Sequence, residues 1–385
     1  QRIENLLDAV NNEEKKIPIG IRVSKISMSK PRLSLGLWDY THNIGDRGMV
    51  PANIQSATDS MKSHFVDSPW ASSDALPRVE NLTDESFTVL DNWIKRWPEA
   101  KQYMVYCAVA DDFNGTKISS SEFEPKVANW ARTIDKHLQK IGINPKQLVI
   151  LLLDEPSSDS QDKIISAWAK AIKGSGAQIR LFQDPTWEHP EKNRIQEAIT
   201  LADIVCPNMS IYYSGGESAQ KYYHNLIESG HKLWFYQCTG PVRTFDPSGY
   251  YRMMAWHAFK AGVTGMGFWS FGDLGGGNSS WNEYAIPGTA YAPAFIDPNG
   301  VTDSVHWQAI REGIEDYECL SMLKDEISKS NNSKLKLQAQ SFLDNVINNI
   351  TTGYKPDYTW KENPQHQQID DCRLKVIRMI EKILQ

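Results

Sequence analysis

The feature of this sequence that most restricts its fold is the regular alternation of short apolar runs with longer amphipathic stretches. Short apolar runs are typical of buried strands, and apolar residues at three- and four-residue steps are typical of helices. Eight apolar runs follow one another, at 33–38, a weak one at 64–67, and at 102–109, 147–153, 177–182, 203–206, 232–237 and 264–271. Seven predicted helices separate them, at 53–63, 84–96, 122–141, 159–173, 191–201, 217–229 and 249–261. This order predicts a parallel β-sheet with a helix after each strand.

Eight such units can form an open doubly wound sheet or a closed barrel. An open sheet that binds dinucleotides carries a GxGxxG turn after its first strand, and no such motif follows the run at 33–38. The sequence therefore favours the α/β class with a (β/α)8 TIM barrel, which needs about 250 residues. The 385 residues of the chain leave room for extensions at both ends.

The flanking segments predict three parts. A loop at 272–303, rich in Gly, Ser, Asn and Pro and containing Trp281 and Tyr284, follows the eighth run, and a predicted helix at 304–327 closes the barrel. Two more amphipathic stretches follow at 335–350 and 370–384. An extended piece at 17–26 reads as the last strand or linker of an upstream domain, or as an edge strand on the barrel. We predict a leader at 1–30, a catalytic barrel at 31–328 and a C-terminal helical appendage at 329–385.

Composition excludes several classes of function. The formal net charge is -6 and no Lys- or Arg-rich run is present, which argues against nucleic acid as a partner. No stretch of 18 apolar residues could span a membrane, and the first residues lack the apolar segment of a signal peptide. The five cysteines form no CxxC pair, the nine histidines show no HExxH spacing and no serine lies in a GxSxG elbow. We expect no metal and no cofactor.

The strongest local signal is the run LLLDEP at 151–156, in which an apolar strand ends in Asp154 and Glu155. Active sites of TIM barrels lie at the C-terminal ends of the strands. Because side chains alternate along a strand, only a bend lets both acids face one substrate, and Pro156 restricts Glu155 in a way that suits such a bend. Neighbouring carboxylates raise the pKa of one of them, which suits a general acid for glycosidic cleavage. The competing interpretation is a helix cap or an ion pair with a barrel arginine.

Most glycosidases need a second carboxylate across the cleft. Strand ends offer four candidates for that position: Asp39, Asp67, Asp184 and Asp273. Alternatively, a 2-acetamido group of the substrate attacks the anomeric carbon. Glu155 would then protonate the leaving oxygen and later deprotonate water, while Asp154 would orient the acetamide N–H.

Aromatic and polar residues at or just past strand ends are candidates for sugar binding, since rings stack on sugars and polar groups read hydroxyls. They are Trp38, Asp39, Tyr212, Tyr213, Gln237, Trp269 and Trp281. The same residues would serve a non-catalytic carbohydrate-binding barrel, which is a further alternative.

Three segments together resemble glycoside hydrolase family 123, the β-N-acetylgalactosaminidases: LLDEP at 152–156, LWDY at 37–40 and, most specifically, WQAIREGIEDYE at 307–318. The resemblance covers roughly 17–327. It implies a (β/α)8 barrel behind an N-terminal β-sandwich, with Asp154 and Glu155 as the pair of a retaining, substrate-assisted exo-β-N-acetylhexosaminidase that passes through an oxazolinium ion.

The same resemblance implies a glycan substrate with a 2-acetamido sugar and a secreted or periplasmic location. No sandwich fits before residue 32, so the leader is either the remnant of one or the chain belongs to a divergent branch. Arg311 and Glu312 could reach the site, but we expect this helical pair to brace the barrel.

Overall fold

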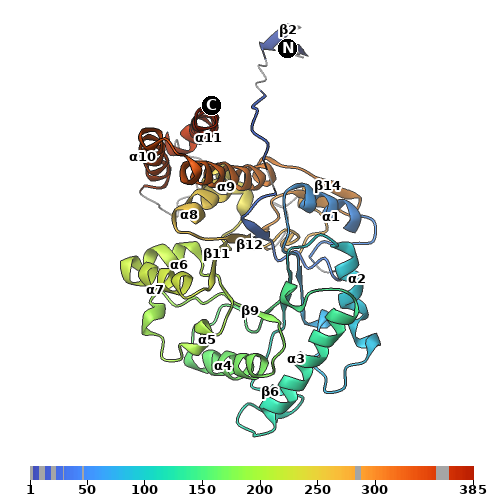
Figure 1. The fold of residues 1–385 in the computed structure, drawn as a ribbon. Helices are drawn as coiled ribbons and strands as arrows, with labels where there is room; N and C mark the ends of the chain where they lie inside the picture. The colour runs from blue at the N-terminus through green and yellow to red at the C-terminus, as the bar shows by residue number, and fades with distance from the viewer. Residues whose placement is uncertain are drawn as a thin grey trace.

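The computed structural model describes residues 3–7, 14–18, 23–28, 30–45, 47–281, 288–352 and 364–385. Tyr284 and residues 19–22 of the leader lie outside the described residues. Eight parallel strands surround a central axis in the order β3-β12-β11-β10-β9-β8-β5-β4, and helices pack around them (Figure 1). The predicted (β/α)8 barrel is confirmed.

The barrel strands are β3 (Ser34–Gly36), β4 (Trp70–Ala71), β5 (Tyr103–Tyr106), β8 (Leu148–Leu151), β9 (Arg180–Gln183), β10 (Ile204–Val205), β11 (Lys232–Gln237) and β12 (Gly265–Phe268). Seven of the eight predicted runs overlap them. The second prediction, 64–67, was wrong, because these residues form the turn that ends the first helix. Phe65 there has a φ of 66°, and the Val66 N–H donates to the Met61 carbonyl at 3.1 Å.

The helices of the barrel are α1 (Ile54–Ser63), α2 (Thr88–Arg96), α3 (Phe123–Lys140), α4 (Asp159–Gly174), α5 (Glu197–Thr200), α6 (Met209–Ser214), α7 (Gly216–Glu228) and α8 (Met253–Lys260). The helix predicted at 191–201 is reduced to a 3-10 turn, Pro190–Lys192, and the short α5. Within the described parts of the chain, no helix is both long and apolar enough to cross a membrane.

In the described part of the chain, three two-stranded antiparallel pairs lie outside the barrel sheet. Strands β6 (Asp112–Phe113) and β7 (Thr116–Lys117) pair in the loop after β5, and β13 (Phe295–Asp297) pairs with β14 (Gly300–Thr302) in the loop after β12. In the leader, β1 (Ile3–Leu7) pairs antiparallel with β2 (Glu14–Pro18) in a separate two-stranded sheet. The described residues of the extended leader piece, 17–18 and 23–26, therefore add no strand to the barrel sheet.

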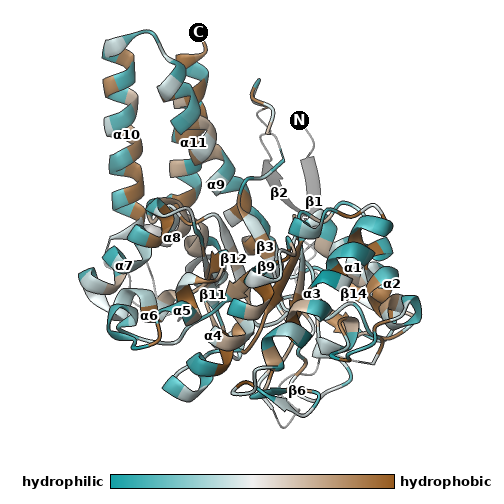
Figure 2. Ribbon diagram, turned by 60° about the horizontal axis from the view of Figure 1, so that its bottom comes forward, coloured by the Kyte–Doolittle hydropathy of each residue, from teal (hydrophilic) through white to brown (hydrophobic). Residues whose placement is uncertain are grey.

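The barrel strands separate two apolar layers, and their hydrophobic colour marks them as the core in Figure 2. Alternate side chains point under the helices, and the others fill the interior, where they include Trp38, Trp70, Met104, Val149, Leu151, Phe182, Trp234 and Tyr236. Glycines make room for these large rings. A Cβ on Gly267 would lie 2.6 Å from the Trp38 ring, and one on Gly265 would lie 2.1 Å from the Trp234 ring. Closely packed side chains, many of them aromatic, thus fill the barrel interior beneath the C-terminal ends of the strands.

Two carboxylates close the barrel between β3 and β4: Asp39, which is fully buried, and Asp67, which is partly buried. Asp67 Oδ1 accepts the Leu35 N–H at 3.0 Å, and the Leu35 carbonyl accepts the Asp67 and Ser68 N–H groups at 3.3 and 3.1 Å. Asp39 Oδ2 accepts the Trp70 N–H at 3.0 Å. Burial raises the pKa of both aspartates, and their hydrogen bonds oppose that effect. Both side chains hold the two strands together where ladder bonds are few.

Three long helices follow the barrel: α9 (Val305–Lys329), α10 (Ser333–Thr351) and α11 (Pro364–Ile383). They share a second apolar core with α8, and Figure 1 shows α10 and α11 beyond α9. The motif at 307–318 lies on α9. Its Asp316 is fully buried and accepts hydrogen bonds from Arg252 Nε at 2.7 Å and Trp256 Nε1 at 2.9 Å, and it forms an ion pair with Arg373, whose Nε lies 2.6 Å from Asp316 Oδ1. The most family-specific segment is therefore a brace between α8, α9 and α11.

Arg311 and Glu312 belong to the same brace. Arg311 Nε lies 3.1 Å from Glu315 Oε1, and Glu312 Oε2 lies 2.8 Å from Arg252 Nη1. Both side chains bind partners on the helices rather than at the C-terminal ends of the strands.

We expect Arg252→Met to lower the free energy of unfolding by about 3 kcal/mol or more, because it leaves the buried Asp316 carboxylate with fewer donors. Arg311→Met is the matched control in the same motif. Its pair with Glu315 is partly exposed, so its loss should cost less than about 1 kcal/mol. Denaturant unfolding of the two variants measures the difference, and equal losses would contradict the bracing role.

Candidate active site

A pocket of about 280 Å³ opens at the C-terminal ends of the barrel strands. The residues that line it follow β3, β8, β9, β11 and β12 or lie in the long loop after β12: Trp38, Asp154, Glu155, Asp184, Tyr236, Cys238, Trp269 and Tyr291. Five residues singled out in the sequence thus come together here: Trp38, Asp154, Glu155, Asp184 and Trp269.

A sharp backbone bend brings the two adjacent acids into this pocket. Strand β8 ends at Leu151, and Glu155 adopts a φ of 45° just before Pro156. A residue with a Cβ reaches this left-handed region at a cost of about 1–2 kcal/mol, so the surroundings must hold it there. The bend overrides the strand alternation that would send Asp154 and Glu155 to opposite faces.

Glu155 receives its partners from β11. The Tyr236 hydroxyl donates a hydrogen bond to Glu155 Oε1, and the Cys238 thiol lies 3.9 Å from the same oxygen. Burial and nearby carboxylates raise the pKa of Tyr236, so the phenol remains a donor. The same causes raise the pKa of Cys238 to about 11, which keeps the thiol neutral. Glu155 is thus held by neutral donors, with no cation among these contacts.

Asp154 and Asp184 line the same pocket with their carboxyl groups side by side, where a proton on one of them could be donated to the other. Burial raises the pKa of Asp184 well above its usual value, and the neighbouring Asp154 charge adds to this effect. The pKa of Asp154 is raised as well, because the pocket walls desolvate it although solvent reaches it from the mouth. Asp184 Oδ1 also accepts the Glu155 N–H at 3.2 Å.

Aromatic rings form the walls of the pocket. Trp38 stacks on Trp70 with ring centroids 4.6 Å apart and an angle of 16°. Trp269 donates from Nε1 to Asp273 Oδ2 at 3.0 Å, and the Arg47 guanidinium lies 4.8 Å from the Trp269 ring centroid. Asp273 therefore faces Trp269 rather than the two acids. These contacts fix the flat faces that a sugar ring could stack on.

Five of the predicted binding residues do not line the pocket: Asp39, Tyr212, Tyr213, Gln237 and Trp281. Asp39 holds the strand seam described above. Tyr212 packs 4.8 Å from the Phe235 ring, and the Tyr213 hydroxyl lies 2.6 Å from His257 Nδ1. Gln237 is fully buried, and Trp281 is 54% exposed and stacked on Phe295.

Three residues that line the pocket were not predicted from the sequence: Tyr236, Cys238 and Tyr291. A signal for the first two exists, because they share the alternation of Trp234, which fills the barrel interior. Gln237, which is predicted from the sequence as a binding residue, lies between Tyr236 and Cys238, so its side chain points to the other face of the strand. Tyr291 lies in a loop without any periodic pattern, so no comparable signal marks it.

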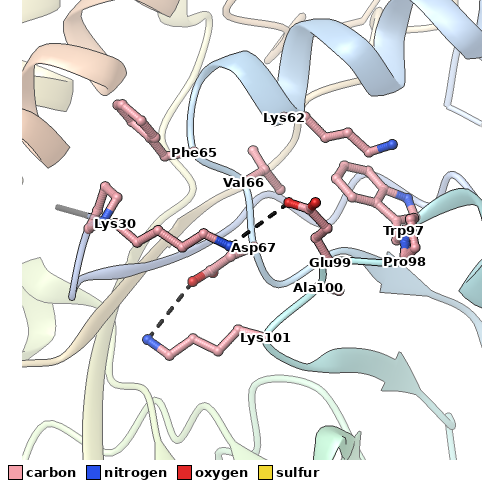
Figure 3. A pocket seen from close by; sticks show the side chains of 11 residues that line it. Lys30, Lys62, Phe65, Val66, Asp67, Trp97, Pro98, Glu99, Ala100 and Lys101 are labelled. Atoms are coloured by element: carbon pink, nitrogen blue, oxygen red, sulfur yellow. Dashed lines mark ion pairs between the residues drawn. The ribbon is translucent and has the colours of Figure 1, made fainter. Parts of the chain in front are cut away.

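A larger cavity of about 680 Å³ lies at the opposite, N-terminal ends of β4 and β5 (Figure 3). Four of its five charged side chains form ion pairs: Lys30 Nζ lies 3.9 Å from Glu99 Oε2, and Lys101 Nζ lies 3.9 Å from Asp67 Oδ2. The fifth, Lys62, donates to the Arg96 carbonyl at 2.9 Å. Residues at this end of a TIM barrel contribute to stability rather than to chemistry. The smaller pocket with its three acids is the candidate active site.

Comparison with curated proteins yields short matches to the bifunctional protein FolD. The FolD of Pyrobaculum aerophilum is 28% identical over 89 residues, which is 23% of this chain and 28% of that protein. The FolD of Pyrobaculum islandicum is 31% identical over 87 residues, 22% of this chain and 27% of that protein. This chain thus spans less than a third of these relatives, too little to transfer an activity.

The barrel itself has a much more extensive relative among solved structures. A family 123 glycoside hydrolase from Clostridium perfringens superposes with a TM-score of 0.63 over 96% of this chain and 74% of that one, at 13% identity, and so shares the fold. The sequence profile of the glycoside hydrolase 123 catalytic domain matches residues 115–323, more than half of the chain. This segment carries Asp154, Glu155 and most of the brace on α9. The chain therefore belongs to glycoside hydrolase family 123.

Proposed function

We propose that this glycoside hydrolase is an exo-β-N-acetylhexosaminidase, similar to N-acetylgalactosaminidases, in which the acetamido group of the substrate is the nucleophile. The observation that carries this proposal is the arrangement of acids in the pocket. Asp154 and Glu155 are consecutive, and the third acid, Asp184, lies beside this pair, where its Oδ1 accepts the Glu155 N–H at 3.2 Å, instead of standing across the pocket. Among the described lining residues, no independent carboxylate remains to serve as a protein nucleophile.

In the proposed reaction, Glu155 gives its proton to the glycosidic oxygen as the bond to the anomeric carbon breaks. The acetamide carbonyl oxygen forms a new bond to that carbon, which yields an oxazolinium ion. Asp154 accepts the acetamide N–H and offsets the positive charge. Water then attacks the anomeric carbon and gives a proton to Glu155, while the bond between that carbon and the acetamide oxygen breaks and restores the acetamide. The sugar therefore leaves with retained configuration.

The size of the pocket supports an exo mode of action. Its volume of about 280 Å³ lies at the small end of ligand pockets, which favours one terminal sugar ring over an extended chain. The relative from Clostridium perfringens is described in terms of glycolipid glycan hydrolysis, which supports a glycan as the substrate class.

The alternative glycosidase, with a second carboxylate across the cleft, would need Asp39, Asp184 or Asp273 in that role. Asp39 is fully buried in the strand seam, and Asp273 accepts hydrogen bonds from Trp269 Nε1 and from the Gly275 N–H, each at 3.0 Å. These contacts turn both carboxylates away from Glu155. The alternative therefore has less support than substrate assistance.

Hydrolysis of three matched aryl β-glycosides tests the proposal: the N-acetylgalactosaminide, the N-acetylglucosaminide and the plain galactoside. We expect kcat/KM for the preferred acetamido sugar to exceed that for the galactoside by at least about 100-fold, since a substrate without the acetamide lacks the nucleophile. Comparable cleavage of the galactoside would overturn substrate assistance. Binding of the sugars without turnover of any glycoside would instead indicate a carbohydrate-binding barrel.

A further inference from the structure

Asp184 lies level with the end of the catalytic strand. Strand β9 pairs in parallel with β8, and the register matches Leu151 with Phe182, so Asp184 stands beside the position of Leu153. Gln183, its neighbour, donates from Nε2 to the Leu153 carbonyl at 2.8 Å and to Asp184 Oδ1 at 3.3 Å. Asp184 is 1% exposed, so its carboxyl group is set by these contacts and not by solvent.

The two oxygens of Asp184 have different surroundings. Oδ1 accepts the Glu155 N–H at 3.2 Å and the Gln183 amide. Oδ2 is buried, and no N–H or hydroxyl of the described residues reaches it. The carboxyl of Asp154 is the partner that remains, and a hydrogen bond between two carboxyl groups requires one shared proton.

The burial of the two groups decides which of them carries this proton. Asp184 is enclosed, whereas Asp154 opens to the pocket. Burial raises the pKa of Asp184 well above its usual value, which favours the proton on Asp184. A protonated Asp184 also avoids a buried charge beside the charge of an ionised Asp154.

From this geometry we infer that Asp184 is a positioning residue: it stays protonated, donates to Asp154, and through its other oxygen holds the backbone of Glu155 in its left-handed bend. One side chain thereby orients both acids. The inference rests on the proposed function for the roles of Asp154 and Glu155. It also states that Asp184 contacts neither the sugar nor the water as a base.

Two substitutions separate positioning from direct catalysis. Asp184→Asn keeps an N–H donor for Asp154 and an oxygen for the Glu155 N–H, whereas Asp184→Ala removes both. We expect kcat/KM to fall by about 100-fold in Asp184→Ala, as for other misplaced catalytic groups, and by less than about tenfold in Asp184→Asn. If Asp184 acts as an ionised nucleophile or base, both variants lose activity equally, which would overturn the inference.

The pH dependence of kcat/KM provides a second test, because a purely structural role of Asp184 would leave this dependence unchanged. Removing the donor in Asp184→Ala raises the pKa of Asp154, so Asp154 becomes protonated at higher pH and the acidic limb of kcat/KM moves to higher pH. In Asp184→Asn the limb should stay near its wild-type position. Besides Glu155, four titratable groups interact electrostatically with Asp154 or Asp184: Tyr106, Cys206, Tyr236 and Cys238. Each of these four has a raised pKa, so none produces an acidic limb.

Infrared difference spectroscopy tests the proton itself without any substrate. The spectrum of the wild-type protein at neutral pH minus that of Asp184→Asn should contain the band of a protonated carboxyl group. If the band is present and no acetamido glycoside is cleaved, the proposed function fails while the protonated Asp184 stands. If the band is absent, Asp184 is ionised and the inference is wrong, whatever the substrate. Thermal unfolding of both variants confirms that the folded state is being compared.

Discussion

The Glu155→Gln variant is expected to hydrolyse acetamido glycosides with a poor leaving group about 10⁴-fold more slowly than the wild-type protein. Glutamine cannot give a proton to the glycosidic oxygen, and a strongly basic leaving group needs that proton. A dinitrophenyl group leaves without protonation, so formation of the oxazolinium ion from such a substrate should be nearly unaffected. Steady-state and pre-steady-state rates for a series of aryl leaving groups measure this contrast.

The leaving-group series is its own control, because every substrate meets the same variant and the same pocket. A second control is Glu217→Gln, which changes an exposed glutamate on α7 and should leave all rates unchanged. A loss of equal size for every leaving group would mean that Glu155 has another role, such as holding Tyr236 through their hydrogen bond.

Asp154→Asn should lower kcat on the preferred acetamido glycoside by about 10³-fold, because a neutral amide no longer offsets the charge that develops on the oxazolinium ion. Its NH₂ group also opposes the acetamide N–H of the substrate. Affinity for the corresponding sugar thiazoline, a stable analogue of the intermediate, should fall in parallel, as measured by calorimetry.

The free N-acetylated sugar is the control ligand for this variant, since it carries no developing charge and should bind with little change. Unchanged thiazoline affinity in Asp154→Asn would contradict the role of Asp154 in stabilising the intermediate. Asparagine and aspartate side chains have the same length, so the substitution should not disturb the fold. A loss of affinity for the thiazoline alone would therefore not reflect misfolding.

The barrel could be predicted from the sequence because its strands are long enough to leave apolar runs. The exceptions have local causes. Strand β4 is only Trp70–Ala71 and follows a proline, so the apolar residues at 64–67, which end α1, gave a stronger signal than the strand itself. The stretch 191–201 has helical spacing, yet Pro190 and the buried Asn193 side chain, which donates to Asp162 at 2.9 Å, hold most of it in turns.

Within the site, strand alternation separates the successful predictions from the others. Trp38 and Trp269 lie two residues beyond Gly36 and Gly267, whose missing side chains face the barrel interior, and both line the pocket. Asp39 and Gln237 lie one residue away from an inward position, and both are buried outside the pocket. Proximity to a strand end alone therefore does not predict which residues line the pocket.

Strand alternation alone does not predict that the adjacent acids Asp154 and Glu155 both face the pocket. Asp154 reaches the pocket through the left-handed bend at Glu155, and that bend depends on Asp184 from the next strand. Such a contact between strands has no local signal. The division into a leader at 1–30, a barrel at 31–328 and an appendage at 329–385 stays a prediction.

The indole rings beneath the pocket and the glycines that face them form interlocked pairs, which limits how this scaffold can acquire a new specificity. A side chain at Gly267 would collide with Trp38, and a smaller residue at position 38 would leave a void above Gly267. Either change alone is harmful, so the depth of the pocket can evolve only through paired substitutions. Tyr291, from the loop after β12, obeys the same constraint, because a Cβ on Gly240 would lie 2.6 Å from its ring. A change of specificity among relatives should therefore require that a ring and its facing glycine change together.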